Sequence, residues 1–170
     1  PRGLAPRLLL LKSEYLSDAL HNAAAYVEHP PKYKVHRGHE LGLGSFGTVY
    51  AGSVVGHSDE PFAIMLFYRI SKMKTDSGAM SEVRRYVALS GHPHVVQLLD
   101  IEVSRQLMEP PCIGFVFQRY DSDVRPCLKK RSFARAGMRH VLRSVLNALV
   151  YTHGNNSAHA DLKPANILLK

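Results

Sequence analysis

The residues best suited to chemistry lie in the stretch HADLKPANILLK at 159–170. Asp161, Lys163 and Asn166 stand at relative positions 0, +2 and +5, so one short segment supplies a carboxylate, an ammonium and an amide oxygen. A carboxylate can orient a hydroxyl nucleophile, an ammonium can neutralise anionic oxygens, and an amide oxygen suits a hard cation such as Mg²⁺. The alternative interpretation is structural, because Asp and Asn side chains also tie down turns.

A glycine-rich stretch, GLGSFGTV at 42–49, is the second candidate. Glycines let backbone N–H groups approach phosphate oxygens closely, because no side chain stands in the way. In a dinucleotide-binding turn such glycines open directly into a helix, whereas here Thr48, Val49 and Tyr50 continue with strand-forming residues. The context favours a strand-turn-strand flap over phosphates, and a plain hairpin with loose glycines is the structural alternative.

Together the two stretches resemble the protein kinase family, and DLKPAN resembles the catalytic loop of its serine/threonine branch. The resemblance covers about residues 33–170. It implies an α+β fold with a small antiparallel β lobe carrying one main helix, and the first helices and catalytic loop of a mostly helical large lobe. It also implies that the glycine flap and the catalytic loop face each other across a nucleotide-sized cleft. The expected divisions are an N-terminal extension at 1–32, a small lobe at 33–117, a hinge at 118–121 and an incomplete large lobe at 122–170.

The resemblance also implies a role for each matching residue. Asp161 matches the base that accepts the proton of a protein hydroxyl, Lys163 matches the lysine that stabilises the transferring phosphoryl group, and Asn166 matches a magnesium ligand. Glu82 matches the helix glutamate that holds a phosphate-binding lysine, with an exposed helix charge near Arg85 as the alternative. The implied cofactors are ATP and Mg²⁺, and the implied partner is a protein substrate.

The nucleotide itself is expected to contact the glycine flap, one face of the sheet, the hinge and one later leucine. Phe117 takes the gatekeeper position before the hinge, and the apolar members of this set are equally compatible with an ordinary core. The predicted nucleotide-binding residues are Leu41, Gly42, Leu43, Gly44, Ser45, Phe46, Gly47, Thr48, Val49, Ala63, Met65, Phe117, Gln118, Tyr120 and Leu168.

Met65 breaks the family pattern, which has a lysine at this position. It lies 18 residues after Gly47 and 17 before Glu82, so the spacing itself fits. A thioether cannot hold phosphates electrostatically, and losing one such donor costs a rate factor of roughly 10²–10³. Residues 41–52 contain no lysine that could substitute, and Glu82 then needs another cation. Candidates for that cation are Arg69, Lys72 and Lys74. A pseudokinase, acting as a nucleotide-binding or scaffolding module, is therefore the alternative function.

Two further departures concern the C-terminal part. Ala160 stands where the family commonly has the arginine that receives a phosphorylated activation loop, so we expect no control of that kind. The sequence ends at Lys170, before the family's Asp-Phe-Gly metal site. We expect that this chain is a fragment of a larger protein, that it does not turn over substrate by itself, and that it exposes the apolar stripe Met138 to Leu149.

Periodicity predicts the elements that position these residues. An amphipathic helix is expected at 13–28 and strands on both sides of the glycine turn. After these we expect a strand at 61–70, a helix at 77–90, strands at 94–103 and 112–120, and a long helix over 138–149 that ends at HGNNS.

The formal charge of +8 comes largely from one segment, Arg119 to Arg143. We favour a solvated helix face for this segment over nucleic-acid binding, because aromatic residues are too few among the charges to give the stacking platforms that single-strand binders require. Docking of an acidic partner or a nucleic acid is the other alternative, and its sign would be binding that falls steeply with salt.

The longest leucine run, Leu8 to Leu11, is too short to span a membrane, and two cysteines in 170 residues predict reduced thiols. We therefore expect an intracellular protein of the cytoplasm, with the nucleus also compatible.

Overall fold

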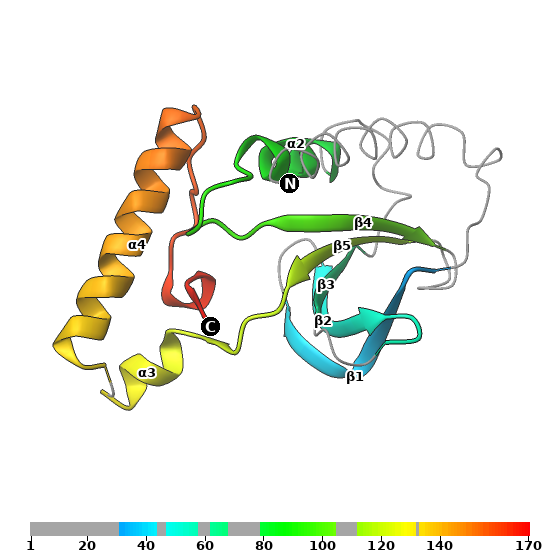
Figure 1. Ribbon diagram of the computed structural model, residues 1–170, viewed down its shortest axis with the longest axis horizontal. Helices are drawn as coiled ribbons and strands as arrows, with labels where there is room; N and C mark the ends of the chain where they lie inside the picture. The colour runs from blue at the N-terminus through cyan, green and yellow to red at the C-terminus, as the bar shows by residue number, and fades with distance from the viewer. Residues whose placement is uncertain (1–30, 44–46, 58–61, 68–78, 105–111, 132) are drawn as a thin grey trace. The chain divides into compact units, whose positions relative to one another are not determined.

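The computed structural model describes residues 31–43, 47–57, 62–67, 79–104, 112–131 and 133–170. These residues form two compact units. Unit 1 takes its described residues from Pro1–Ser90 and Gln97–Arg119, and unit 2 consists of Gly91–Val96 and Tyr120–Lys170. Figure 1 shows both units and labels their longer helices and strands.

Unit 1 is a five-stranded antiparallel sheet with one helix. The strand order is β1-β2-β3-β5-β4, and each neighbouring pair is antiparallel. The sheet and its helix confirm the predicted antiparallel β lobe. Their bounds are β1 (Tyr33–Leu43), β2 (Gly47–Val54), β3 (Phe62–Phe67), α2 (Ala79–Ala88), β4 (Leu98–Ser104) and β5 (Cys112–Gln118).

The sheet of unit 1 is buried on both faces, because apolar residues occupy consecutive positions of its central strands. On one face, Ile64, Leu66 and Val116 are fully buried and cluster with Tyr33. On the other face, α2 packs through Tyr86, whose ring lies 6.1 Å from Phe115 and 5.1 Å from Phe117 in edge-on contacts. Alternation along a strand explains why neighbouring residues serve opposite faces.

A buried carboxylate, that of Asp100 on β4, joins the two edge strands of the sheet. Asp100 is 4% exposed and accepts hydrogen bonds from Tyr33 Oη at 3.0 Å and Lys32 Nζ at 2.8 Å. Its other oxygen accepts the backbone N–H of Ile101 at 2.8 Å. These partners offset the cost of burying a charge. Burial raises the pKa of Tyr33 to about 12, and the hydrogen bond to Asp100 raises the pKa of Lys32.

Unit 2 is mostly helical. The predicted long helix is confirmed as α4 (Arg135–Gly154), and the Asn155 side chain ends it by donating to the Tyr151 carbonyl at 2.8 Å. Further short elements were not predicted from the sequence, because each is too short for periodicity to reveal. They are β6 (Ser122–Asp123), α3 (Arg125–Lys129), the 3₁₀ helix η2 (Pro164–Asn166) and β7 (Leu168–Leu169), with β6 and β7 paired antiparallel.

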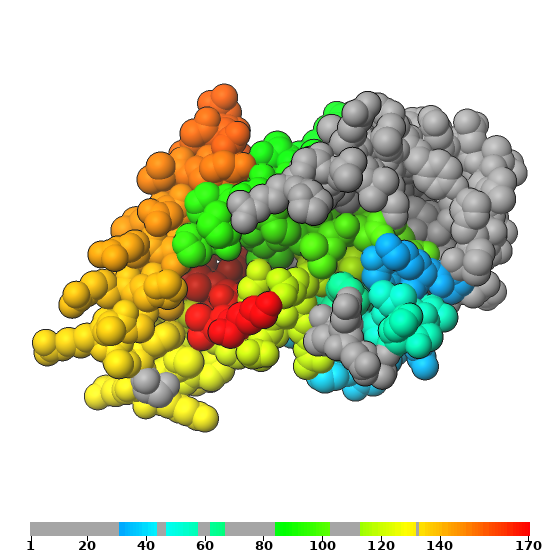
Figure 2. Space-filling view, viewed as in Figure 1, coloured from blue at the N-terminus to red at the C-terminus, as the bar shows by residue number. Residues whose placement is uncertain are grey.

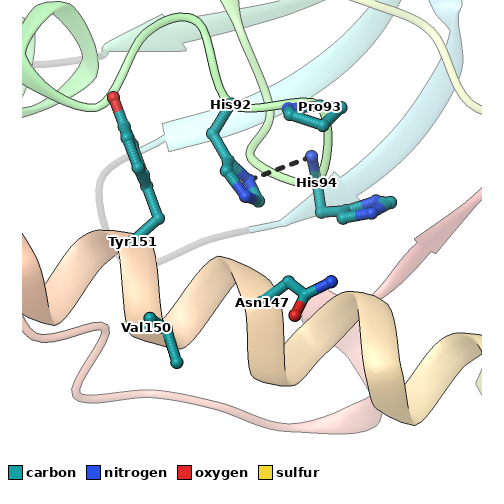
Figure 3. Close-up of a pocket in the computed structure, with 6 residues that line it drawn as sticks. All are labelled: His92, Pro93, His94, Asn147, Val150 and Tyr151. Carbon is teal, nitrogen blue, oxygen red and sulfur yellow. Dashed lines mark hydrogen bonds between the residues drawn. The ribbon is translucent and has the colours of Figure 1, made fainter.

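The segment Gly91–Val96 corrects the predicted strand at 94–103, which begins at Leu98. The backbone N–H groups of His94 and Val95 donate to the side chain and carbonyl of His92, each at 3.2 Å, and so form a turn after Pro93. The His92 ring stacks on Tyr151 of α4, with centroids 4.8 Å apart (Figure 3). The turn therefore belongs to unit 2, where the stacked rings join it to α4, although its valines have a high strand propensity.

The same turn and α4 line a cavity of about 370 Å³, shown in Figure 3. Its lining contains none of the predicted site residues and consists of His92, Pro93, His94, Asn147, Val150 and Tyr151.

The predicted apolar stripe on α4 is exposed in part. Leu142 is 56% exposed and Leu146 is 60% exposed, whereas Met138, Val141 and Leu149 are half-buried. The predicted helix at 13–28 lies outside the described residues, as does the start of the predicted helix at 77–90. Among the helices that the structure describes, none is long and apolar enough to cross a membrane.

Candidate functional site

Asp161, Lys163 and Asn166 lie together in unit 2 and bind one another. Lys163 Nζ lies 2.8 Å from Asp161 Oδ2. The Asn166 side-chain amide donates to the same oxygen at 3.2 Å and to the Asp161 carbonyl at 2.8 Å. The spacing works because η2 turns the chain back after Lys163, whose carbonyl accepts the Asn166 backbone N–H at 2.9 Å. The carboxylate, ammonium and amide therefore form one local cluster, named here the loop triad.

The backbone before the loop triad holds an unusual conformation. Ala160 has a φ of 58°, in the left-handed region, which costs a residue with a Cβ about 1–2 kcal/mol. The turn is held by the Asp161 backbone N–H, which donates to the His159 carbonyl at 2.8 Å and lies 3.3 Å from His159 Nδ1. The sequence offered no signal for this conformation, because alanine carries no preference for it.

The segment after the loop triad is tied to the residues that precede α3. The backbone N–H of Asp121 donates to the Leu169 carbonyl at 2.9 Å, and that of Val124 donates to the Ile167 carbonyl at 3.0 Å. Val124 is 3% exposed, so this short pairing has a buried anchor. The pairing of β6 with β7 therefore restrains the C-terminal side of the loop triad.

Electrostatics keep Asp161 ionised. The hydrogen bond from Lys163 is the main cause that lowers the pKa of Asp161, although the carboxyl is exposed. Both side-chain contacts reach Oδ2, and within the described part of the chain no hydrogen bond to Oδ1 is formed. Oδ1 is thus able to accept a hydroxyl proton while the neighbouring ammonium faces an anion.

The loop triad contains one oxygen that would suit a magnesium ion as a ligand. The Asn166 Nδ2 donors are directed at Asp161, so the amide Oδ1 remains as an acceptor for a hard cation. No group of three or more His, Cys, Asp or Glu residues that could hold a metal occurs among the residues described. The donor set fits an ion that takes its other ligands from phosphate oxygens and water, as Mg²⁺ commonly does.

In unit 1, the strand register brings four of the predicted nucleotide-binding residues to one face of the sheet. Val49 is directly opposite Met65, and Ala63 is directly opposite Phe117. Side chains opposite each other in a ladder point to the same face, and Ala63 and Met65 are two residues apart on β3. Phe117 is 7% exposed and the other three are half-buried. We call this set the sheet face.

The glycine stretch lies at the junction of β1 and β2. Gly42 pairs with Val49 and Leu43 with Thr48, so the chain continues as a strand beyond the glycines and not as a helix. The predicted strand context is confirmed. Thr48 is buried, Gly42 half-buried, and Leu41 and Leu43 are exposed. The predicted residues Gly44, Ser45 and Phe46 lie outside the described part of the chain.

Met65 lies at the middle of the sheet face with apolar neighbours. Its partners across the two ladders are Val49 and Phe115, and β2 contains neither lysine nor arginine. Glu82 belongs to α2, but its side chain lies outside the described residues, as do the cations proposed to replace the missing lysine, Arg69, Lys72 and Lys74. The partner of Glu82 therefore stays a prediction.

The remaining predicted positions are distributed between the two units. Gln118 ends β5 in unit 1 and is exposed. Tyr120 and Leu168 belong to unit 2, where Tyr120 is half-buried and Leu168 is 41% exposed. The predicted contact of Leu168 with the same base as Val49 and Ala63 stays a prediction.

Sequence reasoning missed one ion pair next to the predicted hinge. Arg125 Nη2 lies 2.7 Å from Asp123 Oδ2, and its Nε lies 3.0 Å from Oδ1. The Arg125 backbone N–H also donates to Asp123 Oδ1 at 2.8 Å, and the side-chain hydrogen bonds from Arg125 lower the pKa of Asp123. An Asp two residues before the start of a helix was the available signal, because such residues cap free N–H groups.

Comparison with known proteins identifies relatives of one kind. The protein kinase domain family matches residues 35–170. Cyclin-dependent kinase 4 of Mus musculus is 30% identical over 140 residues, which cover 76% of this chain and 46% of that protein. Mitogen-activated protein kinase 11 of Oryza sativa subsp. japonica is 30% identical over 129 residues, covering 75% of this chain and 22% of that protein. The cyclin-dependent kinase 2 homolog of Crithidia fasciculata is 28% identical over 137 residues, which cover 76% of this chain and 27% of that protein. The chain therefore spans less than half the length of these relatives.

Proposed function

Because the chain belongs to the protein kinase family, we propose that it carries part of the machinery that transfers the γ-phosphoryl group of ATP to a Ser or Thr hydroxyl of a protein. The observation that carries this proposal is the loop triad, in which Lys163 and Asn166 hold the Asp161 carboxylate at 2.8 and 3.2 Å. Phosphoryl transfer requires an oriented nucleophile and positive charge on the phosphoryl oxygens more than it requires covalent help.

In the proposed reaction, Asp161 Oδ1 accepts the proton of the protein hydroxyl. The hydroxyl oxygen forms a bond to the γ-phosphorus, the bond from that phosphorus to the bridging oxygen breaks, and ADP leaves with the electron pair. Asp161 is a carboxylate at neutral pH and can therefore orient the hydroxyl by accepting its hydrogen bond. Its lowered pKa makes it a weak base, so the proton passes to it as the bond to phosphorus forms. Lys163 stabilises the charge on the transferring group. Mg²⁺, when bound, neutralises phosphate oxygens, and Asn166 Oδ1 would be its ligand from this chain.

In the same proposal, unit 1 binds the nucleotide. The sheet face provides an apolar surface for adenine through Val49, Ala63 and Phe117, and Gln118 provides backbone groups at the start of the hinge. The paired strands around the glycine stretch support a flap over the phosphates. Exposed backbone N–H groups are the expected phosphate ligands.

Met65 favours a second candidate function, a pseudokinase that binds nucleotide or partners without efficient turnover. A half-buried thioether between Val49 and Phe115 gives the triphosphate no cation on the sheet face. This candidate keeps the family fold and gives up the rate enhancement that the lysine provides.

Thermal unfolding of the full-length protein with and without millimolar Mg²⁺ and ATP, together with phosphate transfer to a generic protein substrate, tests both candidates. A kinase shows a higher Tm and a transfer rate that Asp161→Asn lowers by about 10²–10⁴. The exposed Glu40→Gln variant, which makes the same change of a carboxylate to an amide, is the matched control and keeps the rate. A higher Tm without transfer supports a pseudokinase that binds nucleotide. An unchanged Tm without transfer contradicts the kinase and leaves the pseudokinase only as a scaffolding module.

A further inference from the structure

Residues 120–170 carry most of the excess positive charge of the chain. They contain nine Lys and Arg residues against three Asp residues, which leaves +6 of the formal +8. Two of the three carboxylates are neutralised locally, since Asp123 pairs with Arg125 and Asp161 pairs with Lys163. The positive charge of unit 2 is therefore not balanced within its own sequence.

The uncompensated charges lie at the last residue of α3, on the two residues that follow it and on the first half of α4. We call this set the basic ridge, and it consists of Lys129, Lys130, Arg131, Arg135, Arg139 and Arg143. All of its side chains are exposed, and within the described residues none forms an ion pair. Figure 2 shows long side chains projecting outward from the yellow segment that holds α3 and the start of α4.

Helix geometry places the arginines of the basic ridge in a row. Arg135, Arg139 and Arg143 are four residues apart on α4, so they share one side of the helix at steps of about 6 Å. At the other end of the ridge, a hollow of about 300 Å³ is lined by Lys129 and Lys130 together with Arg125, Pro126 and Asp123. Because Arg125 already neutralises Asp123, the two lysines give this hollow a net positive charge.

The three arginines of the basic ridge that lie on α4 oppose the stability of that helix. Like charges four residues apart repel each other, and Arg135 is a cation at the positive end of the helix dipole. The first turn of α4 contains no acidic residue, and its N-cap residue Ala134 forms no side-chain cap, so neither offsets the repulsion. A bound anionic partner would remove this repulsion, which is the physical reason to expect one.

We propose that the basic ridge is the docking surface for an acidic segment of a partner protein. In an extended peptide, every second side chain lies on the same side, at intervals of about 6.6–6.8 Å. Carboxylates at alternate positions would therefore meet successive arginines of α4, and a further acidic residue would reach the lysines of the hollow. This inference concerns binding alone and does not depend on phosphoryl transfer.

The surroundings of the ridge favour a peptide over a single-stranded nucleic acid, which needs aromatic platforms for its bases. Phe133 is the aromatic residue between α3 and α4, and it is half-buried. Its ring packs on the first turns of α4, with Cδ1 3.3 Å from where a Cβ on Gly137 would stand. That ring lies against the helix and is only partly exposed, so it is a poor platform for a base.

Fluorescence anisotropy with the full chain tests the proposal. The probes are a labelled 12-residue peptide of alternating Glu and Ser, the same peptide with Gln for Glu, and a labelled 12-nucleotide oligo-dT. The ridge variant is Arg135→Glu with Arg139→Glu, which should fold well because acidic residues near a helix N-terminus are favourable. The matched control is Lys34→Glu with Arg84→Glu, which reverses two exposed cations of unit 1.

We expect the acidic peptide to bind, its Kd to rise about tenfold in the ridge variant, and the control to change it by less than about twofold. The Gln peptide should not bind. Equal weakening by both double variants would reduce the effect to net charge and overturn the proposal. Tighter binding of oligo-dT than of the acidic peptide would also overturn it and assign the ridge to nucleic acid.

Discussion

The two units differ in how they hold their predicted site residues. In unit 1, Val49, Ala63 and Met65 are strand residues, and the ladders and a buried core place them. In unit 2, Asp161, Lys163 and Asn166 are exposed, and they are held mainly by contacts with one another. Unit 1 has Met65 where the family resemblance predicts a lysine, whereas unit 2 contains all three members of the loop triad.

In unit 1, the fold does not depend on the predicted site residues being charged. In unit 2, the predicted site residues also hold the local structure together. The sheet gains its stability from apolar burial, so it accepts a methionine at position 65 without loss of packing. A methionine there provides no positive charge. The loop is shaped by its own functional groups, so losing Asn166 or Lys163 would remove chemistry and local structure together.

The largest expected effect tests the contrast in burial. Leu66 is fully buried in unit 1, whereas Leu146 on α4 is 60% exposed. Leu66→Ala should lower the free energy of unfolding by about 2–5 kcal/mol, because it removes buried methyl groups and leaves a cavity. Leu146→Ala should lower it by less than about 1 kcal/mol. Urea denaturation of the two variants measures this, and equal losses would contradict the contrast.

The next effect tests whether unit 1 lacks a single charge. Met65→Lys should raise the phosphate-transfer rate of the full-length protein by about 10²–10³, because it restores a cation on the sheet face. Met65→Leu, which keeps the volume and adds no charge, is the control. A lysine variant no faster than the leucine variant would mean that the sheet face lacks more than this side chain.

A smaller effect tests how tightly the sheet is packed. A Cβ on Gly52 of β2 would clash with Ile64 Cδ1, lie 2.8 Å from Ile64 Cγ1 and stand 3.0 Å from the Lys34 carbonyl oxygen. Gly52→Ala should therefore cost about 1–3 kcal/mol of unfolding free energy. Gly38→Ala is the control, since no atom lies within 4 Å of its added Cβ. If both variants melt at the wild-type temperature, the sheet is looser than described.

The smallest effect concerns the loop triad and pH. The pKa of Asp161 is lowered, so the stabilisation from its contacts is present above the ordinary value of 3.8 and is lost as pH falls through the lower pKa of the folded state. Lys163→Gln should move the Asp161 pKa upward toward the ordinary value. Carboxyl carbon chemical shifts measured by NMR between pH 2 and 6 report this change. Lys129→Gln, which alters an exposed lysine elsewhere in unit 2, should leave the Asp161 titration unchanged.

Local patterns allowed much of the molecule to be predicted. Three features depend on residues within a few positions of one another. They are the strands beside the glycines, the helix α4, and the arrangement of Asp161, Lys163 and Asn166. Hydrogen bonds in turns and apolar periodicity are local interactions, so a single sequence carries them. The prediction that Met65 replaces a lysine came from the family resemblance, which expects a lysine at this spacing.

Contacts between distant residues decided the rest. Asp100 is buried because Lys32 and Tyr33, more than 60 positions away, supply its partners. The sheet face exists because three strands share one register, and Gly91–Val96 forms a turn because His92 stacks on Tyr151. The free energy of such contacts depends on which segments the folded chain brings together. Neighbouring residues carry no record of it, so these features required the tertiary structure.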